Sequence, residues 1–234
     1  MSEVLSGMLQ YLLNMYFKQF TTQAVLLVVL FFCCDQCFAQ KYVDSNDPNE
    51  VKSLLSKDND IKGFGGVDIK VGLVNEERSL LLGGYGGVII NKHYIFGLAG
   101  YGLSTKNTFI GIPPGQDAEK ELNLYGGYGG LLIGGILFPK EMIHINIPIL
   151  LGAGNMDVSD ENYFNNGIDT EFTIDKSAFF VIEPGIQLEA NITQNLRLGL
   201  GATYRMIQAI DLIHLNDDDL SDYTVALSLR FGRF

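Results

Sequence analysis

Apolar and polar residues alternate from Phe179 to Met206, with one interruption at 193–195. Before the interruption the even positions are mostly apolar and the odd ones mostly polar, and the alternation resumes at Leu196. Because side chains alternate across a strand, the segment predicts a hairpin with one apolar and one polar face. A soluble sandwich shows the same local pattern. A soluble sandwich is distinguished from a membrane barrel only by the number of strands along the whole chain and by whether they form a closed set.

Segments of this kind recur from Gly63 onward, with no helical periodicity between them. The predicted strands are 64–74, 79–90, 94–103, 122–137, 142–153, 178–192, 196–208 and 223–233. Tight turns are expected at 91–93, 138–141 and 193–195, alternating with longer connections at 106–120, 155–176 and 209–222, after a short first link at 75–78. Short turns at one end and long loops at the other are typical of outer-membrane barrels. We therefore predict an all-β fold, an eight-stranded antiparallel up-and-down transmembrane β-barrel.

Two glycine-rich copies, 83–87 and 126–130, both read Gly-Gly-Tyr-Gly-Gly and continue into apolar residues. A phosphate-binding glycine loop needs a lysine and a helix start after the glycines, and neither follows here. We interpret the glycines as structural, because they permit the tight curvature of a small barrel. The tyrosines would cover the bare backbone of neighbouring strands.

With these copies, the Glu183-Pro184-Gly185 segment and the ending at 227–234, the chain from Gly63 to Phe234 resembles the small bacterial outer-membrane β-barrel proteins of the OmpA/OmpX-like group. The resemblance implies contact with outer-membrane lipids and lipopolysaccharide. It also implies that Phe231 and Phe234 form the C-terminal signal that the barrel-assembly machinery reads. It does not select an activity, because such barrels include adhesins, structural proteins and lipid-modifying enzymes.

The N-terminus has the features of a targeting segment. Residues 24–34 are apolar, Lys18 precedes them, and Cys37-Phe38-Ala39 offers small residues where a signal peptidase cleaves. We expect a signal peptide at 1–39 for export through the Sec pathway, a periplasmic tether at 40–62 and the barrel at 63–234. A start at Met15 instead of Met1 would give a signal of conventional length. All three cysteines lie in the removed part, so thiol and disulfide chemistry is not expected.

Composition narrows the partners. The net charge of −11, without a basic cluster along the chain, argues against nucleic acid, whose phosphates need clustered Lys and Arg. No apolar run approaches the roughly 18 residues of a membrane helix. We expect a monomer without a cofactor.

Signals for enzymatic activity are poor. The three histidines, at 93, 144 and 214, fall in a turn, on a lumen-facing strand position and in an outer loop, so no pair has metal-ligand spacing. A serine hydrolase would need Ser and His together, and only His144 is a candidate. An eight-stranded lumen is filled by side chains, which argues against transport. We predict no catalytic residues.

The expected outer loops are acidic. Carboxylates there are weak candidates for binding calcium or magnesium, although no spacing matches a known calcium loop. These candidates are Asp157, Asp160, Glu161, Asp217, Asp218 and Asp219. Solvated loops are the favoured interpretation.

Charges on the polar strand faces predict an ion-pair network, because an isolated buried charge is costly. Its expected members are Asp68, Lys70, Glu183, Glu189, Arg197, Arg205 and Arg230. If 193–195 is the turn, opposed residue numbers in the hairpin have a constant sum. Asn191 then faces Arg197, and Glu183 faces Arg205. We hypothesise that Glu183–Arg205 is an ion pair that fixes register.

Two mid-strand prolines, Pro148 and Pro184, cannot donate to a ladder, so local bulges are expected there. The outward, lipid-facing side chains should include Ile143, Ile145, Ile147, Leu198, Leu200, Leu227 and Leu229.

The function predicted is an outer-membrane barrel with a structural or surface-interaction role. The alternative is a secreted or periplasmic calyx-type barrel that binds a small apolar ligand.

Overall fold

The computed structural model describes residues 59–75, 77–113, 117–160, 172–213 and 215–234. The chain divides into two units, Met1–Leu54 and Leu55–Phe234, and every described residue belongs to the second. The predicted signal peptide and the tether up to residue 58 lie outside the described residues. The first strand begins at Ile61, two residues before the predicted barrel start.

Nine antiparallel strands make up about four-fifths of the described residues. They are β1 (Ile61–Val74), β2 (Glu77–Ile90), β3 (Tyr94–Leu103), β4 (Asn107–Gly111), β5 (Lys120–Leu137), β6 (Ile143–Asp160), β7 (Phe172–Thr193), β8 (Leu196–Gln208) and β9 (Asp222–Gly232). A short helix, α2 (Asp217–Leu220), precedes β9. No helix in the described residues is long and apolar enough to cross a membrane.

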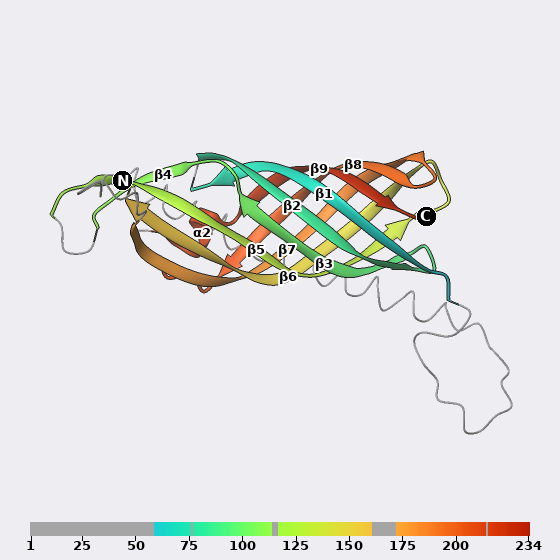
Figure 1. Ribbon diagram of the computed structural model, residues 1–234, viewed down its shortest axis with the longest axis horizontal. Coiled ribbons are helices and arrows are strands. Elements are labelled where there is room, and N and C mark those ends of the chain that lie inside the picture. Colours follow the sequence, from blue (N-terminus) through green and yellow to red (C-terminus); the bar gives the residue numbers. More distant parts are fainter. Residues whose placement is uncertain (1–58, 76, 114–116, 161–171, 214) are drawn as a thin grey trace, which may run out of the picture. The chain divides into compact units, whose positions relative to one another are not determined.

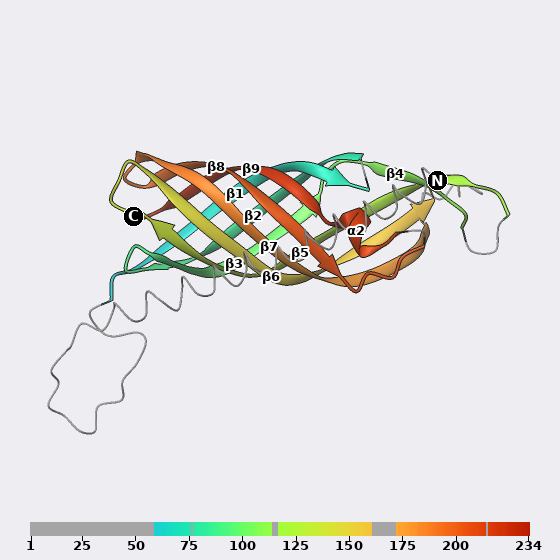
Figure 2. The ribbon, with the colours of Figure 1, turned by 180° about the vertical axis from the view of Figure 1, so that it is seen from behind.

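Strand pairing closes eight of these strands into a ring, which Figures 1 and 2 show from opposite sides. Within the ring, each strand pairs with the next ring strand along the chain, with β3 pairing directly with β5, and β1 pairs with β9 to close the ring. The predicted eight-stranded up-and-down barrel is therefore confirmed. The short strand β4 continues beyond the end of β3 and pairs with the first residues of β5.

The two ends of the barrel differ. The tight turns at 91–93, 138–142 and 194–195 gather at one end, here called the turn end, together with the start of β1 and the end of β9 (Figure 1). The described residues of the longer connections, together with α2, lie at the opposite end, the loop end (Figure 2). This confirms the predicted alternation of short and long connections.

The outer surface of the ring is apolar. Exposed side chains include Val67, Ile69, Val71, Phe96, Leu98, Phe180, Ile186, Leu188, Val225 and Leu227. Of the seven predicted outward residues, Ile143, Leu198, Leu200 and Leu227 are exposed and the other three are half-buried. A soluble fold would bury such residues, whereas a membrane barrel presents them to lipid and keeps polar residues inside.

The β7–β8 hairpin has nearly the predicted register, with Asn191 opposite Arg197. The register shifts by one residue before the turn, so that Thr193 rather than Ile192 pairs with Leu196. An extra residue in one strand beside a turn is a common way to increase twist.

The bulges predicted at Pro148 and Pro184 are wrong. Strands β6 and β7 pair as Asn146–Gln187 and again as Ile149–Pro184, which is one continuous register. Only the two intervening pairs are missing from this ladder. A proline removes a hydrogen-bond donor without needing an inserted residue, so the ladder is interrupted but not shifted.

Paired glycines allow neighbouring strands to approach closely. Gly87 on β2 faces Gly97 on β3, and Gly130 on β5 faces Gly152 on β6. A Cβ atom at any of these four positions would overlap main-chain atoms of the strand opposite. The glycine-rich copies therefore permit close strand packing, as the structural interpretation predicted.

Candidate functional site

The barrel interior contains the seven charged side chains that the sequence assigns to it. Asp68, Lys70, Glu183, Glu189, Arg197, Arg205 and Arg230 are all buried. They comprise three carboxylates and four cations. The interior toward the loop end is mainly apolar, and its fully buried side chains include Val74, Leu81, Leu122, Val158, Phe179 and Leu220.

The first group of contacts is centred on Glu183. The Lys70 ammonium lies 2.6 Å from Oε1 of Glu183, and the two side chains are 4% and 1% exposed. The hydroxyls of Tyr128 (2.8 Å) and Thr203 also donate to the Glu183 carboxylate. The Lys70 ammonium sits 3.4 Å from the centre of the Tyr101 ring. The carboxylate and the ammonium are thus paired and hydrogen-bonded, as buried charges must be.

The predicted Glu183–Arg205 ion pair is wrong. The predicted register places both residues on the interior face, but Glu183 contacts Lys70 from across the lumen. Arg205 instead donates to the main-chain carbonyls of Leu220 (2.8 Å) and Leu73 (2.9 Å). In a narrow barrel, strands that do not pair still face each other across the interior. A long side chain can therefore reach a partner across the lumen, so the ion pair need not form with the residue directly opposite on the neighbouring strand.

A second group of contacts surrounds Glu189 near the turn end. Arg230 approaches this carboxylate at 3.0 Å, His144 at 3.1 Å and Arg197 at 3.9 Å. The amide of Asn146 donates to the same carboxylate at 3.1 Å. One carboxylate therefore serves two guanidinium groups, and Arg197 has the longest of these contacts.

The histidines form no recognisable catalytic arrangement among the described residues. His144 contacts Glu189 through Nε2, and its Nδ1 has no hydrogen-bond partner within the described chain. His93 contacts the carbonyl of Ile136 at 3.2 Å, and His214 lies outside the described residues. His144 thus lies in the interior, as predicted, and no described serine hydroxyl bonds to it.

The structure does not gather the acidic candidates for a metal. Asp157 on β6 pairs with Lys176 at 3.5 Å. Asp217 accepts from the amides of residues 209 and 210, and Asp219 accepts from the amide of Asn216 at the helix start. Asp218 lies between them in α2, whereas Glu161 and the side chain of Asp160 are outside the described part. Among the described residues, no group of three or more metal-ligating side chains could hold an ion.

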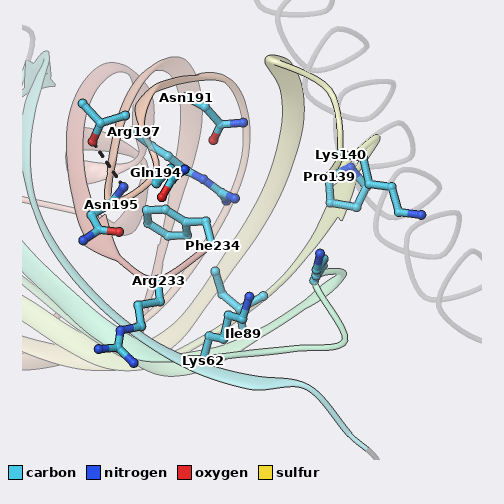
Figure 3. Close-up of a pocket in the computed structure, with 12 residues that line it drawn as sticks. Lys62, Ile89, Pro139, Lys140, Asn191, Gln194, Asn195, Arg197, Arg233 and Phe234 are labelled. Carbon is cyan, nitrogen blue, oxygen red and sulfur yellow. Dashed lines mark hydrogen bonds between the residues drawn. The ribbon is translucent and has the colours of Figure 1, made fainter.

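The turn end has an open pocket of about 700 Å³ (Figure 3). Its lining comprises Lys62, Ile89, Lys92, Pro139, Lys140, Asn191, Thr193, Gln194, Asn195, Arg197, Arg233 and Phe234. The Phe234 ring lies 3.8 Å from the Arg197 guanidinium, and Figure 3 shows the two side chains together amid the group. Phe231, by contrast, is 52% exposed on the outer surface. The two predicted assembly-signal residues therefore lie in different surroundings.

Sequence reasoning missed several polar partners in the interior. The Tyr101 hydroxyl donates to Asp68 at 2.7 Å, and the Gln187 amide donates to Ser228 at 2.8 Å. The tyrosines of the two glycine-rich copies were expected to cover glycine backbone, and Tyr85 does lie against Gly66. The alternation along each strand could have identified these polar partners, because they occupy the same inward-facing positions as the predicted charges.

These features define the class of protein: an eight-stranded transmembrane β-barrel, apolar outside and charged inside. In comparisons with protein-family models and with curated proteins, nothing matches the chain. Similar solved structures include Neisserial surface protein A, at 12% identity and a TM-score of 0.47, over 74% of this chain and 97% of that one. Ail, the attachment invasion locus protein of Yersinia pestis, is 13% identical, with a TM-score of 0.37 over the same shares. The class rests on this chain's own strand pairing.

Proposed function

We propose that this chain is a bacterial outer-membrane barrel with a structural or surface-interaction role and no enzymatic activity. The observation that carries the proposal is the inverted surface, with exposed aliphatic side chains outside the ring and buried charges within it. Only lipid makes that distribution favourable. The turn end faces the periplasm and the loop end faces outward, because outer-membrane barrels have short periplasmic turns.

The interior network would fix the barrel in one register and perform no chemistry. Each of the three buried carboxylates has a hydrogen-bonding partner, which is the arrangement of a structural network. A cavity of about 40 Å³ among Asp68, Tyr85 and Glu183 has room for about one water molecule. This supports a lumen filled by side chains over a transport channel or an apolar calyx.

The proposed partners are lipids and the export machinery. The apolar outer surface of the ring contacts the acyl chains of phospholipid and lipopolysaccharide. The protein inserts as a monomer after Sec-dependent export. Strand β9, with the exposed Phe231, is the segment that the barrel-assembly machinery would recognise. Phe234 would be available for that recognition before it packs against Arg197 in the folded protein.

The experiment is expression of the full chain in a Gram-negative host, followed by membrane fractionation and unheated gel electrophoresis. We expect the protein in the outer-membrane fraction, with a gel mobility that changes on boiling. An epitope inserted at Ile213 in the loop end should be reached by antibody on intact cells. The same epitope at Pro139 in a tight turn should be reached only after permeabilisation. A soluble periplasmic protein with heat-independent mobility would support the calyx alternative instead.

A further inference from the structure

Five basic side chains converge on the turn-end pocket from separate parts of the chain. Lys62 comes from β1, Lys92 from the β2–β3 turn, Lys140 from the β5–β6 turn, Arg197 from β8, and Arg233 follows β9. No acidic side chain is among the residues that line the pocket. Because these residues are far apart in the sequence, only barrel closure reveals the cluster.

Arg197 forms the inner wall of this pocket. Its side chain is 5% exposed, and its charge contact with Glu189 is 3.9 Å long. Its Nε and Nη1 atoms have no hydrogen-bond partner within the described residues. Glu189 is already engaged by Arg230 at 3.0 Å, so Arg197 is incompletely compensated. A buried guanidinium in that state favours an anion beside it.

The rim adds positive charge that the described chain hardly neutralises. Lys62 lies 3.5 Å from Asp60 in a partly exposed pair. Lys92, Lys140 and Arg233 are exposed and have no ion-pair partner within the described residues. Figure 3 shows Lys140 and Arg233 on opposite sides of the Arg197–Phe234 pair. The cations therefore surround the pocket instead of lining one edge.

We propose that the turn-end pocket binds a phosphate-bearing ligand, with Arg197 as its inner contact and the four other cations as its rim. A volume of about 700 Å³ lies within the range of small-molecule sites and exceeds the needs of a single inorganic ion. Arginine recognises phosphate through its planar fork, and lysines add point charges. The phosphate belongs either to a phospholipid headgroup at the membrane surface or to a soluble compound.

Titration calorimetry on the folded full-length barrel in neutral detergent tests the proposal with two probes. One is pyrophosphate, and the other is short-chain phosphatidylglycerol below its micelle concentration. The main variant is Lys92→Gln/Lys140→Gln, because both side chains are exposed in turns and their loss should not affect folding. The matched control is Lys106→Gln/Lys176→Gln, which removes the same charge from the loop end. Arg197→Gln is the second variant, accepted only if its heat-dependent mobility is retained.

We expect at least one probe to bind and its affinity to fall with added salt. The turn variant should bind roughly ten-fold more weakly, while the control stays within about two-fold of the unaltered protein. Binding of the lipid alone assigns the site to a headgroup, and binding of both probes assigns it to phosphate in general. Absence of binding by both probes overturns the proposal. So does an equal loss in the turn variant and the control, since net charge alone would then explain the binding.

Discussion

Replacing Lys70 with methionine should strongly destabilise the barrel. The change keeps the length of the aliphatic stem but leaves the Glu183 carboxylate, only 1% exposed, without its cation at 2.6 Å. Breaking one partner of a buried pair typically costs about 3–5 kcal/mol, because the remaining charge stays buried. The hydroxyls of Tyr128 and Thr203 still donate to Glu183, so we expect about 3 kcal/mol.

The double variant Lys70→Met/Glu183→Gln supplies the decisive comparison. A neutral glutamine can accept from one of the two hydroxyls, of Tyr128 or Thr203, through its amide oxygen and donate its amide N–H to the other, so no charge remains unpaired at this position. The double variant should therefore be more stable than the sum of the single changes predicts, by at least about 2 kcal/mol. Lys62→Met is the matched control: its ion pair with Asp60 is 29% and 46% exposed, so the cost should stay below about 1 kcal/mol.

The assay is guanidinium unfolding of the barrel in phospholipid vesicles. The chain has no tryptophan, so unfolding is followed by circular dichroism of the strands and by heat-dependent gel mobility. Lys70→Met should lower the unfolding midpoint without changing its slope. A cost for Lys70→Met no greater than that of Lys62→Met would refute the reasoning. So would strict additivity in the double variant, because the pair would then not be coupled.

Three further predictions use the same assay. Glu189→Gln should cost about 3–5 kcal/mol, because it leaves two buried guanidinium groups without a carboxylate; a cost below about 1 kcal/mol would contradict this. Gly130→Ala should destabilise the barrel, because its Cβ meets the backbone of β6, whereas Gly102→Ala, with open space, should be nearly neutral; equal effects would exclude the steric explanation. Leu188→Arg, on the outer surface, should cost about 2–4 kcal/mol in vesicles, and a neutral result would place that face outside the lipid.

Most strands of the ring could be predicted, because every second residue of a membrane strand faces lipid and is therefore apolar. The segment around Leu188 shows this, since its outward and inward residues follow parity without exception from 186 to 190. Strand β4 was not predicted, because it is only five residues long. Its buried face carries Asn107, Phe109 and Gly111, so the sequence shows no apolar alternation there. The extension of β6 to Asp160 was missed for a similar reason, because polar residues beyond Ala153 resemble a loop.

The sequence predicts which charged residues point into the barrel interior, but it does not predict which of them pair with each other. Parity assigns Lys70, Glu183 and Arg205 to the lumen, and hairpin register compares only neighbouring strands. The partner of Glu183 comes from β1, which pairs with neither β7 nor β8, so no pairwise rule identifies it. The basic pocket at the turn end escaped sequence reasoning for the same reason. Its cations come from different strands and turns, and they meet only when the sheet closes.

Lipid contact by the outer surface is the central requirement of a membrane-spanning barrel, and the absence of tryptophan from the chain permits a clean measurement of it. A single reporter is introduced as Leu200→Trp, at an outward position that is 59% exposed, and compared with Lys106→Trp in the loop end. Both variants are folded into vesicles of phospholipid brominated on the acyl chains. We expect strong quenching of the fluorescence of Leu200→Trp and little quenching of that of Lys106→Trp. Equal, weak quenching of both reporters would contradict a barrel that spans the membrane.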